Sequence, residues 1–169
     1  IGDKSVHEVV RYRKRFTLSP ALKKAKGVVL RFLAVDYECR VWVNGCFAAA
    51  HRGGYGAFYV DITKYLTPYD EQIVAVEARD TLDECQPRGK QSWLPEAHRC
   101  WYTQTTGIWQ SVWLEAHDGD FIKKLTVTPD PGTNRVTIET ALEYGKADGL
   151  TAEIVTPVGE KITFSRSLS

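Results

Sequence analysis

Apolar and polar residues alternate along most of this chain, in short segments separated by glycine, proline, asparagine and aspartate. Alternation with a period of two places successive side chains on opposite faces of the backbone and is typical of half-buried β-strands. Residues 28–35 are instead almost continuously apolar, as expected of a strand buried in a sandwich. The pattern predicts an all-β fold with strands at residues 9–18, 28–35, 37–43, 46–51, 57–60, 72–79, 108–116, 121–128, 135–144, 150–156 and 161–166.

Two local signals add detail to this pattern. The dipeptide Asn44-Gly45 lies between two alternating segments, so it predicts a two-residue hairpin turn that pairs Val43 with Cys46. Asp61 precedes residues 62–66, and an aspartate at this position can accept hydrogen bonds from the first free N–H groups of a helix. A brief helical turn is therefore predicted at 62–66.

The segment His117-Asp118-Gly119-Asp120 reads as a linker and divides the chain into two predicted domains, residues 1–117 and 118–169. An immunoglobulin-like sandwich needs about seven strands, whereas the second segment contains about four. We therefore expect the second domain to be incomplete at Ser169. The chain begins at Ile1 and contains no methionine, so we interpret it as a piece of a longer protein.

Residues 80–107 show little periodicity. A loop of this length is uncommon in a compact domain unless it has a function, and binding residues concentrate on loops. This loop contains Trp93, Trp101 and Tyr102. For Trp101 and Tyr102, ligand contact and packing are both open at this point.

The predicted strand after this loop carries two further tryptophans. Alternation places Trp109 and Trp113 on one face, and Ile108, Val112 and Leu114 on the other. Indoles on the second face of a strand need a partner, either another domain or a sugar ring. Packing is the commoner role, since aromatic side chains dominate buried area in cores and interfaces.

The charges of the chain nearly cancel, with 22 basic and 21 acidic residues. Nucleic-acid and membrane surfaces bind proteins with a marked basic excess, so the balance argues against both partners. No apolar run is long enough to span a bilayer. The four histidines are scattered and the cysteines form no Cys-x-x-Cys pair, so the sequence predicts no metal site, no cofactor and no Ser–His–Asp triad.

The four cysteines are Cys39, Cys46, Cys85 and Cys100. The predicted hairpin register separates Cys39 and Cys46 by roughly 13 Å, beyond the ~7 Å limit of a disulfide. A bond between Cys85 and Cys100, both in the long loop, stays open. Free thiols are the favoured interpretation, and they favour a reducing compartment such as the bacterial cytoplasm.

Six motifs occur in order along the chain: Val41-Trp42-Val43-Asn44-Gly45, Gly53-Gly54-Tyr55, Phe58, Asp61-Ile62-Thr63, Gly89-Lys90-Gln91-Ser92-Trp93 and Thr105-Thr106-Gly107-Ile108-Trp109-Gln110-Ser111-Val112-Trp113-Leu114-Glu115. Each is weak alone, but the ordered set closely resembles the N-terminal sugar-binding domain of glycoside hydrolase family 2. That family includes bacterial β-galactosidases, β-glucuronidases and β-mannosidases. The resemblance covers roughly residues 9–115. The remainder, from Phe121, looks like the start of the immunoglobulin-like domain that follows in these enzymes.

The resemblance implies a jelly-roll, galactose-binding-like β-sandwich followed by a partial immunoglobulin-like β-sandwich. It also implies a parent enzyme that hydrolyses O-glycosyl bonds on a separate TIM-barrel domain, using two glutamates, and that we expect to be a homo-oligomer. The acid/base glutamate of the family follows an asparagine, and this chain has no Asn-Glu dipeptide. The carboxylates of the first domain are instead interpreted as caps, turn residues or surface charges: Asp36, Asp61, Asp80, Asp83, Glu84 and Glu96. We therefore predict that the chain alone is inactive.

By resemblance, Asn44 contacts the bound sugar, although Asn-Gly is also the commonest signal for a tight turn. Trp101 stands where several relatives have a sugar-binding aspartate, and an indole there can stack on a sugar ring or pack on the barrel. The predicted sugar contacts are Asn44, Trp101 and Tyr102, and the predicted interdomain contacts are Trp93, Trp109 and Trp113. The leading interpretation is a non-catalytic accessory domain that shapes the active-site wall. The alternatives are an autonomous carbohydrate-binding module and a purely structural or oligomer-forming domain.

Overall fold

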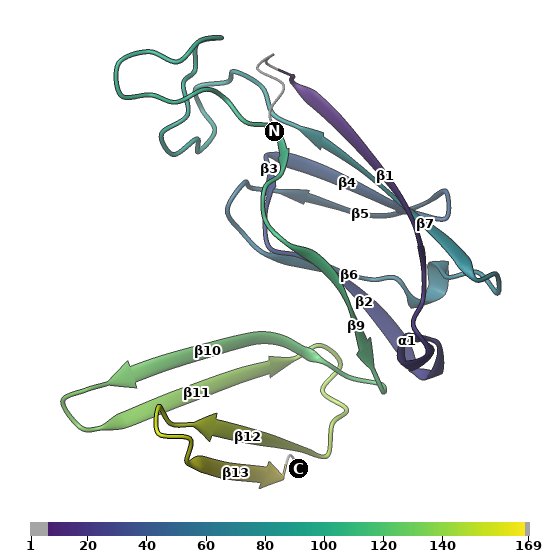
Figure 1. Cartoon of the computed structure of the whole chain (residues 1–169), viewed down its shortest axis with the longest axis vertical. Coiled ribbons are helices and arrows are strands. Elements are labelled where there is room, and N and C mark those ends of the chain that lie inside the picture. The colour runs from purple at the N-terminus through teal and green to yellow at the C-terminus, as the bar shows by residue number, and fades with distance from the viewer. Residues whose placement is uncertain (1–6, 168–169) are drawn as a thin grey trace. The chain divides into compact units, whose positions relative to one another are not determined.

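The computed structural model of the chain describes residues 7–167 and is almost entirely β-structure, as the sequence pattern predicts. The chain divides into two compact units, residues 1–116 and 117–169. Each unit has its own sheets (Figure 1). No helix within residues 7–167 has the length and apolar character needed to cross a membrane.

The first unit is a sandwich of antiparallel sheets. One sheet has four strands in the order β1 (Val9–Thr17), β7 (Glu71–Arg79), β4 (Glu38–Val43) and β5 (Cys46–Arg52). A three-stranded sheet has the order β6 (Phe58–Asp61), β2 (Gly27–Phe32) and β9 (Val112–His117). A short pair, β3 (Val35–Asp36) and β8 (Gly107–Ile108), lies at the end from which the long loop extends (Figure 1).

The core of the first unit is filled by side chains from the facing surfaces of the two larger sheets. Val41 and Val43 of β4 contribute from one sheet, and Val28, Leu30 and Phe32 of β2 contribute from the other. Alternation along β4 places the exposed Glu38 and Arg40 outside, so period two is obeyed in this strand. Burying a side chain of this size stabilises the fold by about 1.5–3 kcal/mol.

The Asn44-Gly45 turn is the predicted two-residue hairpin. Val43 pairs with Cys46, which confirms the predicted pairing at the turn. An irregularity between Val41 and Trp42 then shifts the register by one residue, so Cys39 lies opposite His51. Both turn residues have positive φ, 50° for Asn44 and 83° for Gly45. Such turns match the natural twist of the flanking strands and favour asparagine and glycine.

Two short helices flank the core. The 3-10 turn η1 (Thr63–Tyr65) follows Asp61, whose Oδ1 accepts a hydrogen bond from the Thr63 N–H at 2.9 Å, as the sequence predicts. The helix α1 (Pro20–Lys24) is not predicted by periodicity, because five residues are too few to show a period. Its signal is local: Ser19 caps the Leu22 N–H, and Pro20 occupies the first turn.

The predicted strand at 108–116 is wrong in one respect, because it is interrupted at residues 109–111. β8 pairs with β3, whereas β9 pairs with β2, so the chain changes partner between them. The Ser111 carbonyl accepts from the Leu33 N–H at the start of the new pairing. Trp109 and Trp113 therefore do not share one face of a continuous strand.

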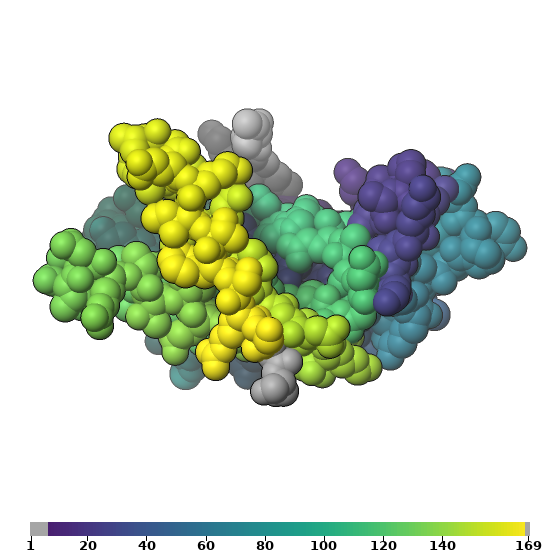
Figure 2. Space-filling model, turned by 90° about the horizontal axis from the view of Figure 1, so that it is seen from below, coloured from purple at the N-terminus to yellow at the C-terminus, as the bar shows by residue number. Residues whose placement is uncertain are grey.

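The second unit consists of two hairpins, β10 (Ile122–Asp130) with β11 (Arg135–Leu142), and β12 (Gly149–Val155) with β13 (Lys161–Ser167). The register of β12 and β13 places Ala152 opposite Phe164, next to Ile154 opposite Ile162, on one apolar face. Phe164 and Ile162 remain exposed. Figure 2 shows this hairpin, in yellow, on the side turned toward the viewer.

Candidate functional site

The long loop between β7 and β8 is the candidate functional region. It leaves the sheet at Asp80, returns at Gly107, and extends beyond the ends of the strands (Figure 1). Its regular structure is limited to two isolated bridges, Gln91 with Tyr102 and His98 with Trp101.

Backbone hydrogen bonds hold the two arms of the loop together. The Tyr102 N–H donates to the Lys90 carbonyl at 2.8 Å, and the Ser92 N–H donates to the Tyr102 carbonyl at 2.7 Å. At the tip, His98 and Trp101 exchange backbone hydrogen bonds of 3.2 and 2.9 Å. We define residues 90–92 as the outgoing arm, 93–101 as the tip and 102–106 as the returning arm.

A first side-chain anchor attaches these arms to the sandwich. Asp36 of β3 is 5% exposed, and its carboxylate accepts a 2.7 Å hydrogen bond from Gln91 Nε2. Gln91 Oε1 accepts from the Thr105 N–H at 2.6 Å. Gly54 packs so closely on Asp36 that an added Cβ would lie 2.9 Å from the carboxyl carbon.

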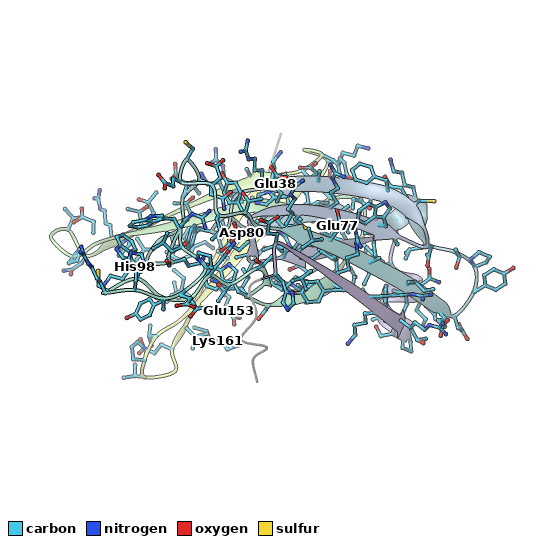
Figure 3. All side chains as sticks on the ribbon, turned by 90° about the horizontal axis from the view of Figure 1, so that it is seen from above. Glu38, Glu77, Asp80, His98, Glu153 and Lys161 are labelled. Carbon is cyan, nitrogen blue, oxygen red and sulfur yellow. The ribbon has the colours of Figure 1, made fainter. Side chains whose placement is uncertain are left out.

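A second anchor lies at the end of β7, where Figure 3 labels Asp80. Asp80 is 2% exposed and accepts from Gln104 Nε2 at 2.8 Å and from Gln86 Nε2. The buried guanidinium of Arg88 donates to the carbonyls of Thr81 and Asp83. The loop therefore has a polar interior of its own.

The charges in this interior affect Asp36. Burial raises the pKa of the Asp36 carboxyl above its ordinary value, the Gln91 hydrogen bond opposes that rise, and the nearby Asp80 adds to it. Arg88 lowers the Asp36 pKa by a smaller amount. An ionised carboxylate out of water requires such hydrogen bonds and counter-charges.

The interpretation of Asp36 and Asp80 as surface or turn charges is wrong, because both are buried in the anchors. Asp83 fits that interpretation, since its Oδ1 caps the Cys85 N–H. Gln91 and Gln104 were not predicted as functional positions. The sequence gives little indication of their role. Glutamine is common in loops, and the buried aspartate that each one binds lies far away along the chain.

The tip of the loop presents aromatic rings. Trp93 packs edge-to-face against Trp101 and His98, both with ring centroids 5.1 Å away. Ser92 Oγ contacts His98 Nδ1 at 3.0 Å, which fixes that ring (His98 is labelled in Figure 3). Tyr102, at the start of the returning arm, is 66% exposed. Trp93 thus supports Trp101, and Tyr102 stands open beside them.

The third predicted sugar contact, Asn44, lies elsewhere. The β4–β7 ladder runs from Glu38 opposite Arg79 to Val43 opposite Val74. The ladder is roughly 17 Å long at ~3.3 Å per residue, and Asn44 and the loop lie beyond its opposite ends. The structure does not bring Asn44 together with Trp101 and Tyr102 in one site.

The Asn44 side chain also has protein partners. Its Nδ2 donates to the Tyr65 carbonyl at 2.9 Å and to Gln72 Oε1 at 2.7 Å, and its Oδ1 accepts from the Ile73 N–H at 2.8 Å. The amide fastens the hairpin turn to η1 and to the start of β7. These contacts favour the structural interpretation of Asn44.

Two of the three tryptophans predicted to face another domain, Trp109 and Trp113, are both partly exposed. Trp109 Nε1 donates to the Gly54 carbonyl at 2.7 Å, and its ring meets Tyr55 edge-to-face. Trp113 Nε1 donates to Glu115 Oε1 at 2.7 Å. In each case the polar end of the indole is satisfied within the unit while part of the ring is left open.

A hollow of about 550 Å³ lies between the returning arm and the start of β1, lined by Val9, Val10 and Arg11 and by Gln104, Thr105 and Thr106. Within residues 7–167, no cluster of three or more His, Cys, Asp or Glu side chains is arranged to hold a metal ion. The four cysteines are free thiols. The site therefore offers aromatic faces, amides and hydroxyls.

The geometry can be set beside known proteins. The family description "Glycosyl hydrolases family 2, sugar binding domain" matches residues 3–117. A β-galactosidase of Thermoanaerobacter pseudethanolicus is 32% identical over 120 residues, covering 70% of this chain and 15% of that protein. A β-glucuronidase of Paenibacillus borealis is 28% identical over 120 residues, covering 64% of this chain and 20% of that protein.

Solved structures show the same fold. A β-glucuronidase from Ruminococcus gnavus, in complex with D-glucaro 1,5-lactone, has a TM-score of 0.70 at 18% identity over 96% of this chain and 29% of its own. A glycosyl hydrolase family 2 member from Bacteroides cellulosilyticus DSM 14838 has a TM-score of 0.68 at 23% identity, covering 99% of this chain and 23% of its own. The chain thus spans less than a third of the length of each of these proteins.

Proposed function

This chain belongs to glycoside hydrolase family 2, whose sugar-binding domain it carries, and from that premise we propose that it is a non-catalytic accessory domain of a larger hydrolase. In this proposal the loop of residues 80–106 forms part of one wall of a substrate pocket, whose catalytic groups belong to a separate barrel domain. The parent enzyme would act on β-galactosides, β-glucuronides or related O-glycosides, as the names of its relatives suggest.

The single observation that carries the proposal is the way the loop is built. Two buried carboxylates, Asp36 and Asp80, hold it through glutamine amides, while the half-buried Trp101 of the tip and the exposed Tyr102 beside it present aromatic rings. Ordering a loop costs about 1–2 kcal/mol per residue in backbone entropy. A long loop that is nevertheless held in one conformation by buried hydrogen bonds is therefore typical of a functional segment. Aromatic faces suit either the apolar face of a sugar ring or a protein surface.

The chemistry of the chain agrees with an accessory role. Retaining glycosidases place two carboxyl groups about 5–5.5 Å apart, with access to the substrate. The buried carboxylates here, Asp36 and Asp80, already accept hydrogen bonds from glutamine amides in the interior. Trp101 and Tyr102 remain the proposed sugar contacts, whereas Asn44 is proposed to support the fold.

The second unit is proposed to be the N-terminal part of an immunoglobulin-like sandwich. Each of its hairpins has one apolar face with exposed members, such as Leu125 and Val127 on β10 and Phe164 on β13. Two hairpins supply fewer strands than the roughly seven of an immunoglobulin-like sandwich. Trp93, Trp109 and Trp113 are proposed to pack on neighbouring domains of the parent.

The accessory role is tested with the chain by itself and with the parent enzyme. The purified chain should hydrolyse no nitrophenyl β-galactoside or β-glucuronide, and substituting Trp101 by alanine in the parent should raise KM. Turnover by the chain, with contamination excluded, would overturn the proposal. Unchanged kcat and KM in the substituted parent would favour a purely structural or oligomer-forming domain.

An autonomous carbohydrate-binding module is the second candidate, and the exposure of Tyr102 beside Trp101 favours it. Such a module would bind oligosaccharides without a barrel. Titration calorimetry or tryptophan fluorescence of the chain with galacto- and glucurono-oligosaccharides separates the two roles. Saturable binding supports the module, and its absence supports the accessory role.

A further inference from the structure

Gln91 holds together three parts of the first unit. Its Nε2 donates to Asp36 on β3, and its Oε1 accepts from the Thr105 N–H and lies 3.3 Å from the Thr105 hydroxyl. Its own backbone bridges to Tyr102. Asp36 in turn pairs with Gly107, directly after the returning arm. The contacts form a closed ring from β3 through both arms of the loop and back to β3.

The other glutamines of the loop do less. Gln104 joins the returning arm to Asp80, and Gln86 joins Asp80 and Thr81, which lie within six residues of it. Neither contacts both arms. The ladder between the arms holds them to each other. Gln91 ties this ladder to β3 and also contacts the returning arm, whereas Gln104 ties only the returning arm to Asp80 at the end of β7.

The chemistry of the position requires a neutral amide. One end must donate to a buried carboxylate, and the other end must accept from a backbone N–H. A glutamate cannot donate when ionised, and a lysine has no acceptor. Asp36 already faces Asp80 and Arg88, so a third carboxylate there adds like-charge repulsion.

We infer that Gln91 is the positioning residue of this domain: it sets where the tip rings and Tyr102 stand relative to the sandwich. This inference rests on the proposed function only for the identity of the surface, a sugar or another domain, that those rings contact. Gln91 itself acts through Thr105 and the arm ladder, since its amide is committed to Asp36 and Thr105.

The test compares Gln91→Met with Gln86→Met, a matched change in a second glutamine bound to a buried aspartate. Hydrogen exchange of the Ser92 and Tyr102 amides should become about tenfold faster or more in Gln91→Met and stay unchanged in Gln86→Met. The tryptophan-detected unfolding midpoint should differ little between the two. Unchanged exchange in Gln91→Met, or equal acceleration in both variants, would overturn the positioning role.

Two further measurements exclude a general loss of packing. Loss of the Gln91 hydrogen bond should raise the pKa of Asp36, followed by carboxyl NMR, and Gln86→Met should leave it in place. Gln91→Glu should loosen the loop at neutral pH and recover it in acid, where a protonated glutamate can donate to Asp36. A Gln91→Glu loop that is equally loose at both pH values contradicts the inference.

The proposed function is tested separately by placing Gln91→Met in the parent hydrolase. Faster exchange in the chain together with a raised KM in the parent supports both ideas. Faster exchange with unchanged kinetics supports the positioning role and overturns the proposed function. Exchange that stays slow overturns the positioning role whatever the kinetics show.

Discussion

The two units of this chain bury their apolar residues to very different degrees. Phe32 in the first unit is 1% exposed and stacks on Phe58 with ring centroids 4.6 Å apart, whereas Phe164 in the second unit is 56% exposed. Both units consist of well-paired antiparallel strands. The difference lies in whether a second sheet covers the apolar face. Strand pairing satisfies the backbone hydrogen bonds, but the side chains on the apolar face stay in water until another layer packs on them.

This difference predicts that the units have unequal stability. All five tryptophans lie in the first unit, so tryptophan fluorescence reports on that unit alone, while far-UV circular dichroism reports on both. The comparison can therefore be tested in one sample with two probes.

The largest effect should come from truncating the core of the first unit. Phe32→Ala removes a ring from a closed core and should cost about 3–5 kcal/mol of unfolding free energy. Phe164→Ala, the matched change on an open face, should cost about 1 kcal/mol or less. Denaturant titrations followed by tryptophan fluorescence and circular dichroism measure both. Equal losses for the two variants would show that Phe164 is covered in solution.

The next effect concerns the fit of the first unit around Asp36. Gly54→Ala places a Cβ 2.9 Å from the Asp36 carboxyl carbon, whereas in Gly56→Ala the nearest atoms, of His51, are 3.9 Å away. Overpacking of this kind costs about 1–3 kcal/mol, so Gly54→Ala should lower the tryptophan-detected midpoint. Gly56→Ala is the control and should leave it within error. A silent Gly54→Ala would mean that Asp36 can move aside at little cost.

The stability of the second unit should fall as the pH is lowered, as is usual for a carboxylate that is hydrogen-bonded in the folded state. Asp120 accepts hydrogen bonds from the backbone N–H groups of Tyr144, Lys146, Phe121 and Ala147, and these lower its pKa to about 2. Its stabilising effect is present above the unfolded pKa, ~3.9, and is lost as the pH falls toward about 2. Asp120→Asn should weaken the second unit at neutral pH and flatten its acid dependence, as measured by amide NMR.

The smallest effect is the pH dependence that Asp36 gives to the stability of the first unit, and its sign is opposite to that of Asp120. Burial raises the pKa of Asp36, so the folded first unit holds this proton more tightly than the unfolded chain. Stability from this group is greatest below the unfolded pKa and falls as the pH rises through the raised folded value. Asp36→Asn should remove that slope from the tryptophan-detected unfolding free energy above the unfolded pKa of ~3.9. A steeper fall of stability with rising pH in Asp36→Asn would contradict a raised pKa for Asp36.

Much of the fold follows from local pattern. The pairing of Val43 with Cys46 follows from Asn44-Gly45, and the alternation in β1 and β4 identifies their inner faces. The interruption at residues 109–111 does not follow, because alternation continues through it in the sequence. The change of partner from β3 to β2 depends on strands some 70 to 90 residues away along the chain.

The candidate site divides in the same way. The loop and its aromatic tip are visible in the sequence as an aperiodic, tryptophan-containing segment. The separation of Asn44 from Trp101, and the commitment of Asn44 to Gln72 and Tyr65, depend on the length of the β4–β7 ladder. Short motifs therefore identified the family but did not assemble one site.

By itself, the sequence determined most of the strands, the tight turn, the family and the segment that carries the aromatic rings, because these depend on residues close together in the chain. The tertiary structure alone decided that Asp36 and Asp80 are buried, that Gln91 joins β3 to both arms of the loop, and that Asn44 lies at the far end of the sheet. Burial and partnership are properties of side chains brought together from distant positions. Their energies come from the exclusion of water, and only the folded chain determines where water is excluded.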